Sequence, residues 1–289
     1  MDSLLLRCVL LSLIVFLNLV TSEPQQVNNR PIIAILAQET NEKPNSQMIS
    51  AVIVNFVEAS GARVVPVFIN RSAEYYEHVF NSTNGVLFPG GDLDPLLTTG
   101  YGKSAKAMFD LAVKANKRGD YYPIWGTCLG FETLSVLSSK QHYPLIKCDS
   151  WNVANALNFL IQPEYLRWTR MFRNASNEVI RLLQTENVTV NYHHFCLTPE
   201  NFEKYGLNEQ IMAISTNQDK NGVQFISSME FKHYPFYGIQ FHPEFVLFDF
   251  DDDMTAVPHT ANAVYVSQYF SRVFVNEARK SFHSFKNKT

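Results

Sequence analysis

A cysteine stands between two glycines in residues 123–132, which read PIWGTCLGFE. The apolar residues 121–125 predict a short buried strand, and the helical spacing that continues to Leu137 predicts a helix after it. A nucleophile between glycines at a strand-to-helix turn is the arrangement of a nucleophile elbow. Free backbone N–H groups at the start of a helix lower the pKa of a thiol and stabilise an oxyanion. The stretch therefore predicts a reactive Cys128, although a tight turn around a buried, inert thiol fits the same residues.

Strands and helices alternate on both sides of this turn. Short apolar runs predict buried strands, helical spacing predicts helices between them, and Lys-Asn-Gly at 220–222 predicts a hairpin turn. The predicted strands cover residues 31–37, 62–69, 85–88, 211–216, 223–229 and 237–241, and the predicted helices cover 46–60, 72–80, 103–118 and 260–279. This order predicts an α/β fold: a doubly wound, mostly parallel sheet flanked by helices, with an antiparallel extension.

The composition of the 289 residues is ordinary for a globular protein, with 46% hydrophobic and 18% charged residues. The formal net charge is -3 and no block of Lys or Arg occurs, which argues against nucleic acid as a partner. No apolar run after residue 22 is long enough to cross a bilayer, so no membrane contact is expected once the leader is removed. Residues 23–289 are predicted to form a single domain.

The first 22 residues have the layout of a secretory signal peptide. Arg7 precedes an apolar run at 8–20, and short residues at 20–22 precede Glu23. We expect cleavage near Ser22; the alternative is an uncleaved signal anchor, for which the run is short. The protein is therefore expected to be secreted or lysosomal.

Five N-x-[ST] sequons fit this route, because such sequons are glycosylated in secreted chains. They begin at Asn70, Asn81, Asn174, Asn187 and Asn287. We expect sugar on the first four, since the last lies at the end of the chain.

The cysteine count bears on the predicted secretory route and on the state of Cys128. Cys8 would leave with the signal peptide, so Cys128, Cys148 and Cys196 would remain. An odd number in an oxidising compartment implies a free thiol or an intermolecular bond. A free Cys128 beside a Cys148–Cys196 disulfide fits, although spacing alone does not bring the two together. No metal-type cysteine spacing occurs, and the acidic residues 249–253 lack a calcium-loop pattern, so no metal is expected.

Three further phrases carry residues with functional chemistry. Gly90 and Gly91 follow a predicted strand and form either a nest of N–H groups for an anion or a simple turn. Glu39 follows the first predicted strand, where ligands of open α/β sheets bind, or is a solvated loop carboxylate. His193 belongs to an Asn-Tyr-His-His phrase whose histidines serve packing as readily as function.

The phrase His242-Pro243-Glu244 pairs an imidazole with a carboxylate. On an extended segment, residues two apart point to the same side, so the two side chains are expected to meet. A carboxylate beside an imidazole fixes the tautomer of the ring and stabilises its cation.

Together these phrases resemble the class I glutamine amidotransferases, which carry a Cys-His-Glu triad and an oxyanion strand. The chain is still more similar to the gamma-glutamyl hydrolase family, over essentially the whole sequence after the signal segment. The phrases that carry this resemblance, in the order of the family, are FPGG at 88–91, WGTCLGFE at 125–132 and FVNEARK at 274–280.

The resemblance implies a role for each residue of the triad. Cys128 would be the thiolate nucleophile, His242 the general base and acid, and Glu244 the residue that orients His242. The backbone N–H groups of Gly91 and Leu129 would hold the oxyanion.

Other residues are expected to bind the substrate. His193 matches the second active-site histidine of the family and would position the scissile end. Glu132 stands where the amidotransferases usually carry Gln, and its carboxylate would accept hydrogen bonds from the α-ammonium of a γ-linked glutamate. Gly90 and Glu39 complete the expected set, and Phe245 stands where the hydrolases commonly carry Lys.

The resemblance implies a homodimeric hydrolase, without metal or organic cofactor, that cleaves poly-γ-glutamyl folates and antifolates through a γ-glutamyl thioester. It leaves open which γ-bond of the chain is cut. One alternative is a glutamine amidotransferase, which would be cytosolic, so the signal segment and the sequons argue against it. The other is a catalytically inactive secreted glycoprotein that binds γ-glutamyl ligands and has no need of a depressed thiol pKa.

Overall fold

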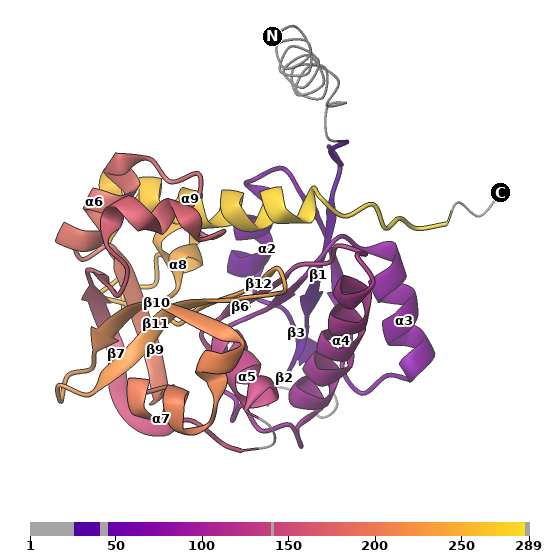
Figure 1. Ribbon diagram of the computed structural model, residues 1–289, viewed down its shortest axis with the longest axis horizontal. Helices are drawn as coiled ribbons and strands as arrows, with labels where there is room; N and C mark the ends of the chain where they lie inside the picture. The colour runs from indigo at the N-terminus through magenta and orange to yellow at the C-terminus, as the bar shows by residue number, and fades with distance from the viewer. Residues whose placement is uncertain (1–25, 41–45, 140–141, 287–289) are drawn as a thin grey trace, which may run out of the picture.

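The computed structural model describes residues 26–40, 46–139 and 142–286 (Figure 1). The predicted signal segment 1–22 and the sequon at Asn287 lie outside these residues. An eight-stranded sheet runs through the centre of the molecule. Its strand order is β4 (Arg63–Val67), β1 (Ile32–Leu36), β5 (Val86–Phe88), β6 (Ile124–Thr127), β12 (Phe236–Ile239), β11 (Gln224–Phe231), β10 (Ile211–Gln218) and β8 (Asn158–Phe159).

The sheet has a parallel and an antiparallel part that meet at β12. Every pairing from β4 to β12 is parallel, and every pairing from β12 to β8 is antiparallel. The Asp219 N–H donates to the Val223 carbonyl at 3.0 Å and closes the predicted hairpin turn between β10 and β11. The predicted fold class, a mostly parallel sheet with an antiparallel extension, is confirmed.

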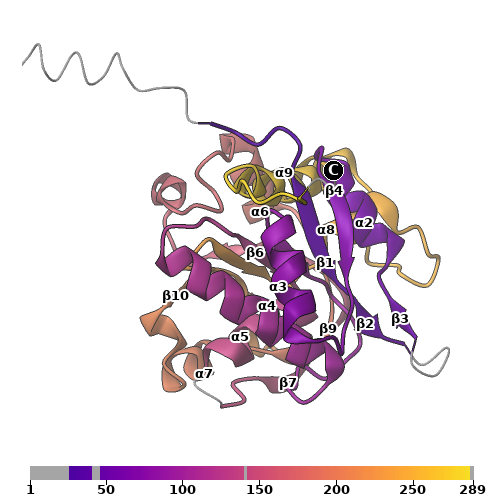
Figure 2. The ribbon, with the colours of Figure 1, turned by 90° about the vertical axis from the view of Figure 1, so that its right-hand side faces the viewer.

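Helices cover both faces of the sheet. The α-helices are α2 (Ala51–Glu58), α3 (Ala73–Ser82), α4 (Gly100–Lys117), α5 (Leu129–Ser138), α6 (Asn177–Thr185), α7 (Pro199–Lys204), α8 (Pro243–Phe248) and α9 (Ala261–Ala278), and the 3₁₀ helices are η1 (Pro163–Trp168) and η2 (Leu207–Glu209). Alternate side chains of β1 enter the two cores, as the period of a strand requires. Ile33 and Ile35 pack with α2, α6 and α9, whereas Ala34 and Leu36 pack with α3, α4 and α5. Figure 2 shows α4 and α5 on one side of β1 and α2 on the other.

A second, two-stranded sheet consists of β7 (Ile146–Asn155) and β9 (Thr189–Cys196), which pair antiparallel. Neither of these strands was predicted from the sequence. Most of β7 is half-buried or exposed, and its register with β9 shifts twice. Because bulges break the two-residue alternation, the pattern of apolar residues does not reveal this strand.

Several predicted boundaries were wrong by a few residues, and two of them affect the surroundings of Cys128 and Gln38. Helix α2 begins at Ala51 rather than at residue 46, because residues 47–48 form strand β3 (Gln47–Met48) and pair with β2 (Gln38–Glu39). Strand β6 runs to Thr127, two residues beyond the predicted strand, so it leads directly into the cysteine turn.

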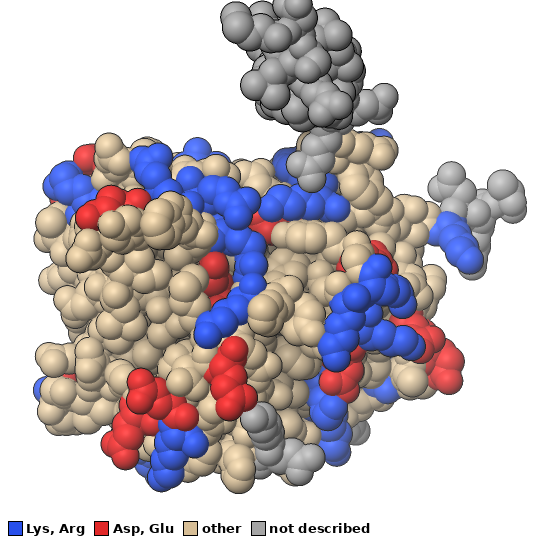
Figure 3. Space-filling view, in the orientation of Figure 1, with Lys and Arg blue, Asp and Glu red and all other residues tan. Residues whose placement is uncertain are grey.

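The surface is mixed in charge. Figure 3 shows acidic and basic side chains interspersed on one face, most of which is uncharged. In the part of the chain that the structure describes, no helix combines the length and the apolar character needed to span a bilayer.

Candidate active site

Cys128 forms the turn between β6 and α5. Its φ of 50° and ψ of -107° lie outside the regions that non-glycine residues favour. The Cys128 N–H donates to the Ile239 carbonyl at 2.9 Å, which ties the turn to β12. A Cβ on Gly130 would lie 2.0 Å from the Phe88 carbonyl oxygen, so a side chain has no room there. The structure thus has the predicted strand-to-helix turn, and the neighbouring strands hold its strained backbone in place.

His242 and Glu244 form a buried pair. The Nδ1 atom of His242 lies 2.7 Å from Oε1 of Glu244, and the two residues are 3% and 1% exposed. The predicted contact is present, but the segment is not extended as expected. His242 is the N-cap of α8 and Pro243 is its first residue, so the turn into a helix brings the two side chains together. A carboxylate only accepts, so Nδ1 carries the hydrogen and Nε2 of a neutral ring is left as an acceptor.

Gly90 lies between the nucleophile and the histidine. A Cβ at this position would lie 3.2 Å from Cβ of Cys128 and 2.4 Å from Cε1 of His242. Any side chain at Gly90 would therefore displace the imidazole. Nε2 of Gln38 donates to the Gly90 carbonyl at 2.6 Å and fixes this loop. Gln38 was not predicted as a site residue, and the only signal for it in the sequence is its position just after the predicted strand at 31–37.

Two backbone N–H groups face the sulfur of Cys128. They belong to Leu129, the first residue of α5, and to Gly91, which is exposed. Burial nevertheless raises the pKa of the Cys128 thiol well above its usual range, and the carboxylates of Glu132 and Glu244 raise it further. The two N–H groups lower the pKa of the thiol, but by less than burial and the carboxylates raise it. The expected lowering of the thiol pKa was wrong because Cys128 is only 3% exposed and loses the hydration that a thiolate needs.

Glu132 lies buried on the first turn of α5. Its Oε1 accepts a hydrogen bond from Nε2 of Gln240 at 3.0 Å. Burial raises the pKa of Glu132 to about 8, so its carboxyl group is mostly neutral at pH 7. Among the described residues, Oε1 of Gln240 has no hydrogen-bond partner. Gln240 was not predicted as a site residue, because it lies two residues before His242 but belongs to no recognisable motif.

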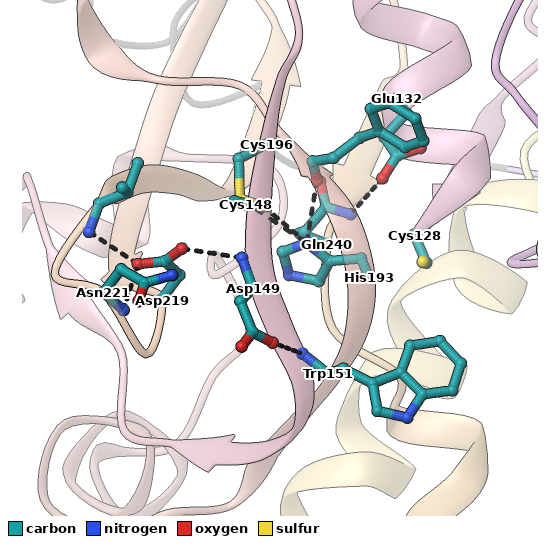
Figure 4. The surroundings of a disulfide bond; sticks show 12 residues. Cys128, Glu132, Cys148, Asp149, Trp151, His193, Cys196, Asp219, Asn221 and Gln240 are labelled. Atoms are coloured by element: carbon teal, nitrogen blue, oxygen red, sulfur yellow. Dashed lines mark hydrogen bonds between the residues drawn. A yellow bond between two sulfur atoms is a disulfide. The ribbon is translucent and has the colours of Figure 1, made fainter.

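His193 points into the interior beside a disulfide (Figure 4). Its Nδ1 donates to the Phe195 carbonyl at 2.9 Å, so Nε2 is an acceptor in the neutral ring. This buried Nε2 has no partner among the described residues. Burial lowers the pKa of His193 to about 3, and the ring is therefore neutral at physiological pH.

The disulfide joins Cys148 of β7 to Cys196 of β9, which confirms the predicted pair and leaves Cys128 as the free cysteine among the described residues. Nδ1 of His193 lies 3.7 Å and 3.8 Å from the two sulfur atoms. These three residues are close enough to hold a metal ion, but bonded sulfurs offer no thiolate ligands.

Glu39 belongs to β2, and its side chain contacts the first turn of α4. Both of its carboxylate oxygens accept the Tyr101 N–H, at 3.2 Å and 3.3 Å, which caps this helix. The Tyr101 hydroxyl donates to the Pro89 carbonyl at 3.1 Å and so supports the Gly90 loop. Glu39 thus holds the loop through Tyr101, and its binding of substrate stays a prediction.

Comparisons with known proteins agree with this geometry. A sequence profile of the Peptidase C26 family matches residues 31–244. Gamma-glutamyl hydrolase B of Dictyostelium discoideum is 36% identical over 285 residues, which cover 96% of this chain and 81% of that protein. Gamma-glutamyl hydrolase of Homo sapiens is 38% identical over 264 residues, which cover 90% of this chain and 81% of that protein.

Solved structures support the fold. The crystal structure of a putative GMP synthase component from Thermoplasma acidophilum aligns with a TM-score of 0.50 at 12% identity, over 87% of this chain and 98% of that one. The profile spans most of the chain, and the curated relatives match along nearly all of it. The chain therefore belongs to the gamma-glutamyl hydrolase family, Peptidase C26.

Proposed function

We propose that this protein is a cysteine-dependent hydrolase that cleaves the γ-glutamyl bonds of folate poly-γ-glutamates. The observation that carries the proposal is the meeting of Cys128 and His242 at Gly90, with Glu244 bonded to the far side of the imidazole. The names of the curated relatives support the γ-glutamyl substrate. Two further points belong to the proposal. The folate group lies on the acyl side of the cleaved bond, and the catalytic residues are Cys128, His242 and Glu244.

In the first half-reaction the thiol gives its proton to Nε2 of His242 while Sγ of Cys128 bonds to the γ-carbonyl carbon. The carbonyl oxygen becomes an oxyanion that accepts hydrogen bonds from the N–H groups of Gly91 and Leu129. When the C=O bond re-forms, the C–N bond breaks and His242 returns the proton to the leaving nitrogen. The products are a γ-glutamyl thioester and a free amine. Because the thiol pKa is raised, proton removal accompanies the attack and does not precede it.

In the second half-reaction a water molecule gives a proton to His242 as its oxygen bonds to the thioester carbon. The C–S bond then breaks, the proton returns to sulfur, and the γ-carboxylic acid is released. Throughout both steps Glu244 holds the Nδ1–H of His242 and stabilises the imidazolium.

Buried polar groups beside the nucleophile can form hydrogen bonds with the substrate. The unpartnered Nε2 of His193 can accept an amide N–H of the γ-linked chain. A neutral Glu132 can donate its O–H to an α-carboxylate of the substrate. The α-ammonium interaction first expected for Glu132 applies only to the amino-terminal residue of a plain γ-glutamyl peptide, because every other nitrogen in the chain is an amide.

The same proposal places the protein outside the cytoplasm, secreted or in the lysosome, as a glycoprotein. The side chains of Asn70, Asn81, Asn174 and Asn187 are on exposed residues, as attachment of sugar requires. The Cys148–Cys196 disulfide is typical of an oxidising compartment. Treatment of the secreted protein with an N-glycosidase should reduce its mass at these four sites, and an unchanged mass would contradict the glycoprotein proposal.

The test is hydrolysis of folate pentaglutamate, followed by mass spectrometry of the products at mildly acidic and neutral pH. We expect the wild type to release hydrolysis products and Cys128→Ala and His242→Ala to release none. The control is His259→Ala, because the ring of His259 stacks on Phe250; it should release products as the wild type does. Release by Cys128→Ala equal to that of the wild type would identify a different nucleophile. Binding of the pentaglutamate without release by the wild type would leave a binding glycoprotein.

A further inference from the structure

A row of aromatic rings leads from His242 to the molecular surface. The ring of Phe245 stacks on the imidazole of His242, with centroids 4.1 Å apart and planes at 2°. Tyr192 meets Phe245 edge to face at 5.8 Å, and Trp151 meets Tyr192 in the same way at 5.3 Å. These rings come from α8, β9 and β7, so three elements that are separate in sequence build one continuous row.

The outer end of the row is open to solvent. Trp151 is 42% exposed, and one face of its indole stacks on exposed His194, with centroids 4.9 Å apart and planes at 4°. We call Trp151 and His194 the aromatic platform. A single exposed aromatic residue is ordinary on a protein surface, so exposure alone assigns no role to it.

The position of the platform relative to the nucleophile is what gives it a role. Sγ of Cys128 lies 3.8 Å from the backbone carbonyl oxygen of Tyr192, and Tyr192 is the strand partner of Trp151. One residue therefore separates the indole from the sulfur, a span on the order of 10 Å. Figure 4 shows the indole of Trp151 directed to the side on which Cys128 lies.

An exposed indole binds a flat aromatic ring through stacking. Folate polyglutamates carry one such group near the γ-chain, the p-aminobenzoyl ring on the α-nitrogen of the first glutamate. With that glutamate extended, the ring centre lies about 8 Å from its own γ-carbonyl carbon. Each further glutamate between the ring and the attacked carbonyl would add about 6 Å, and the ring would pass beyond the platform.

We infer that the aromatic platform binds the p-aminobenzoyl ring of the glutamate that Cys128 attacks, so that the enzyme cuts the innermost γ-bond. This inference rests on the proposed function and adds the position of cleavage to it. The thioester would then carry the aryl-glutamyl group, and the remaining γ-glutamyl chain would leave as one piece.

Two synthetic substrates test it: p-aminobenzoyl-γ-pentaglutamate and plain γ-pentaglutamate, which lacks the ring. The measured quantity is the ratio of kcat/KM for the first substrate to that for the second. We expect Trp151→Ala to lower this ratio about tenfold and Trp151→Phe to keep most of it, because stacking needs only a ring. Trp168→Ala is the matched control, since Trp168 is 78% exposed and its ring packs on Tyr165. This control should keep the wild-type ratio.

The first products decide the position of the cut. We expect p-aminobenzoyl-glutamate and γ-tetraglutamate to appear together at early times. A first product of p-aminobenzoyl-tetraglutamate and free glutamate would overturn the inference, and so would an unchanged kcat/KM ratio in Trp151→Ala. In both cases the proposed γ-glutamyl hydrolysis would stand, whereas failure of the wild type to cut either substrate would overturn the proposed function as well.

Discussion

Nδ1 of His242 lies 2.7 Å from Oε1 of Glu244, within the first turn of helix α8. A carboxylate that is two residues away in sequence and belongs to the same turn needs no distant element to position it. The pair is buried, so water does not screen it and the imidazole keeps one tautomer. The nitrogen that remains free to take the thiol proton is therefore Nε2.

Glu244→Ala should lower kcat by about 100-fold, because the ring loses its orientation and its imidazolium loses a counter-charge. Glu244→Gln should lose less, since the amide oxygen still accepts the Nδ1–H. Steady-state kinetics with folate pentaglutamate measures both effects. Glu58→Gln, an exposed change on α2, should leave kcat unchanged. A Glu244→Ala variant with wild-type kcat would remove Glu244 from the catalytic set.

Alkylation of Cys128 by iodoacetamide should be slow at neutral pH and should still be rising with pH above 8.5, because burial raises the thiol pKa. Glu132 is mostly neutral below its pKa of about 8 and charged above it. Glu132→Gln should therefore change the alkylation rate little at pH 6.5 and raise it by about threefold to tenfold at pH 9. Mass spectrometry of the modified peptide gives the rates. A wild-type rate that reaches its plateau below pH 7 would show that the thiol pKa is depressed.

His193 should make the protein sensitive to acid. Its folded pKa of about 3 lies below the unfolded value of about 6.5, so the stabilisation is complete above pH 6.5 and is lost as pH falls towards 3. The free energy of unfolding should drop by about 3 kcal/mol between pH 6.5 and pH 4 through this residue. His193→Asn keeps a donor for the Phe195 carbonyl. Its free energy of unfolding should therefore fall by about 3 kcal/mol less than that of the wild type over the same pH range. Urea unfolding at several pH values tests this, with exposed His233→Asn as the control. If the free energy of unfolding depended on pH in the same way in the wild type and in His193→Asn, the prediction would be contradicted.

The Cys148–Cys196 disulfide closes a loop with a sequence separation of 48. Replacing both cysteines with Ser should lower the free energy of unfolding by about 4 kcal/mol, because the unfolded chain regains the freedom of that loop. It should also lower kcat/KM, since the disulfide packs against His193. Denaturation and kinetics on the same samples measure both quantities. Cys128→Ala, which keeps the disulfide, should retain wild-type stability, and a double variant as stable as the wild type would refute the expectation.

The parts of this molecule that were predictable from sequence are those encoded locally. The parallel strands are buried on both faces, so each appears as a continuous apolar run. The cysteine turn and the contact between His242 and Glu244 follow from neighbouring residues, although the segment that carries the pair turns into helix α8 and is not extended as predicted. The Cys148–Cys196 pair is not local; it was predicted only as the pair that remains when Cys128 is the free nucleophile, and the strands that bring the two cysteines together were not predicted.

The remaining features depend on the assembled fold. Gln38 and Gln240 act through contacts with Gly90 and Glu132, which are far from them in sequence. The direction of the thiol pKa was wrong because it is set by burial, and five residues around Cys128 do not show how many other segments cover it. Glycine at position 90 is required by the imidazole of His242, a neighbour that appears only in three dimensions.

The place of β12 in the sheet has a consequence for biosynthesis. This strand inserts between β6 and β11, and it leads directly to His242. During translation β6 and Cys128 emerge first, and the inner edge of β6 stays unpaired until β12 is made. A nascent or truncated chain that ends before residue 236 would therefore hold a thiol without its base, at the open edge of an incomplete sheet. Such a fragment would be inactive and prone to aggregate, so the quality control of a newly made chain and the onset of its activity would depend on the same late event.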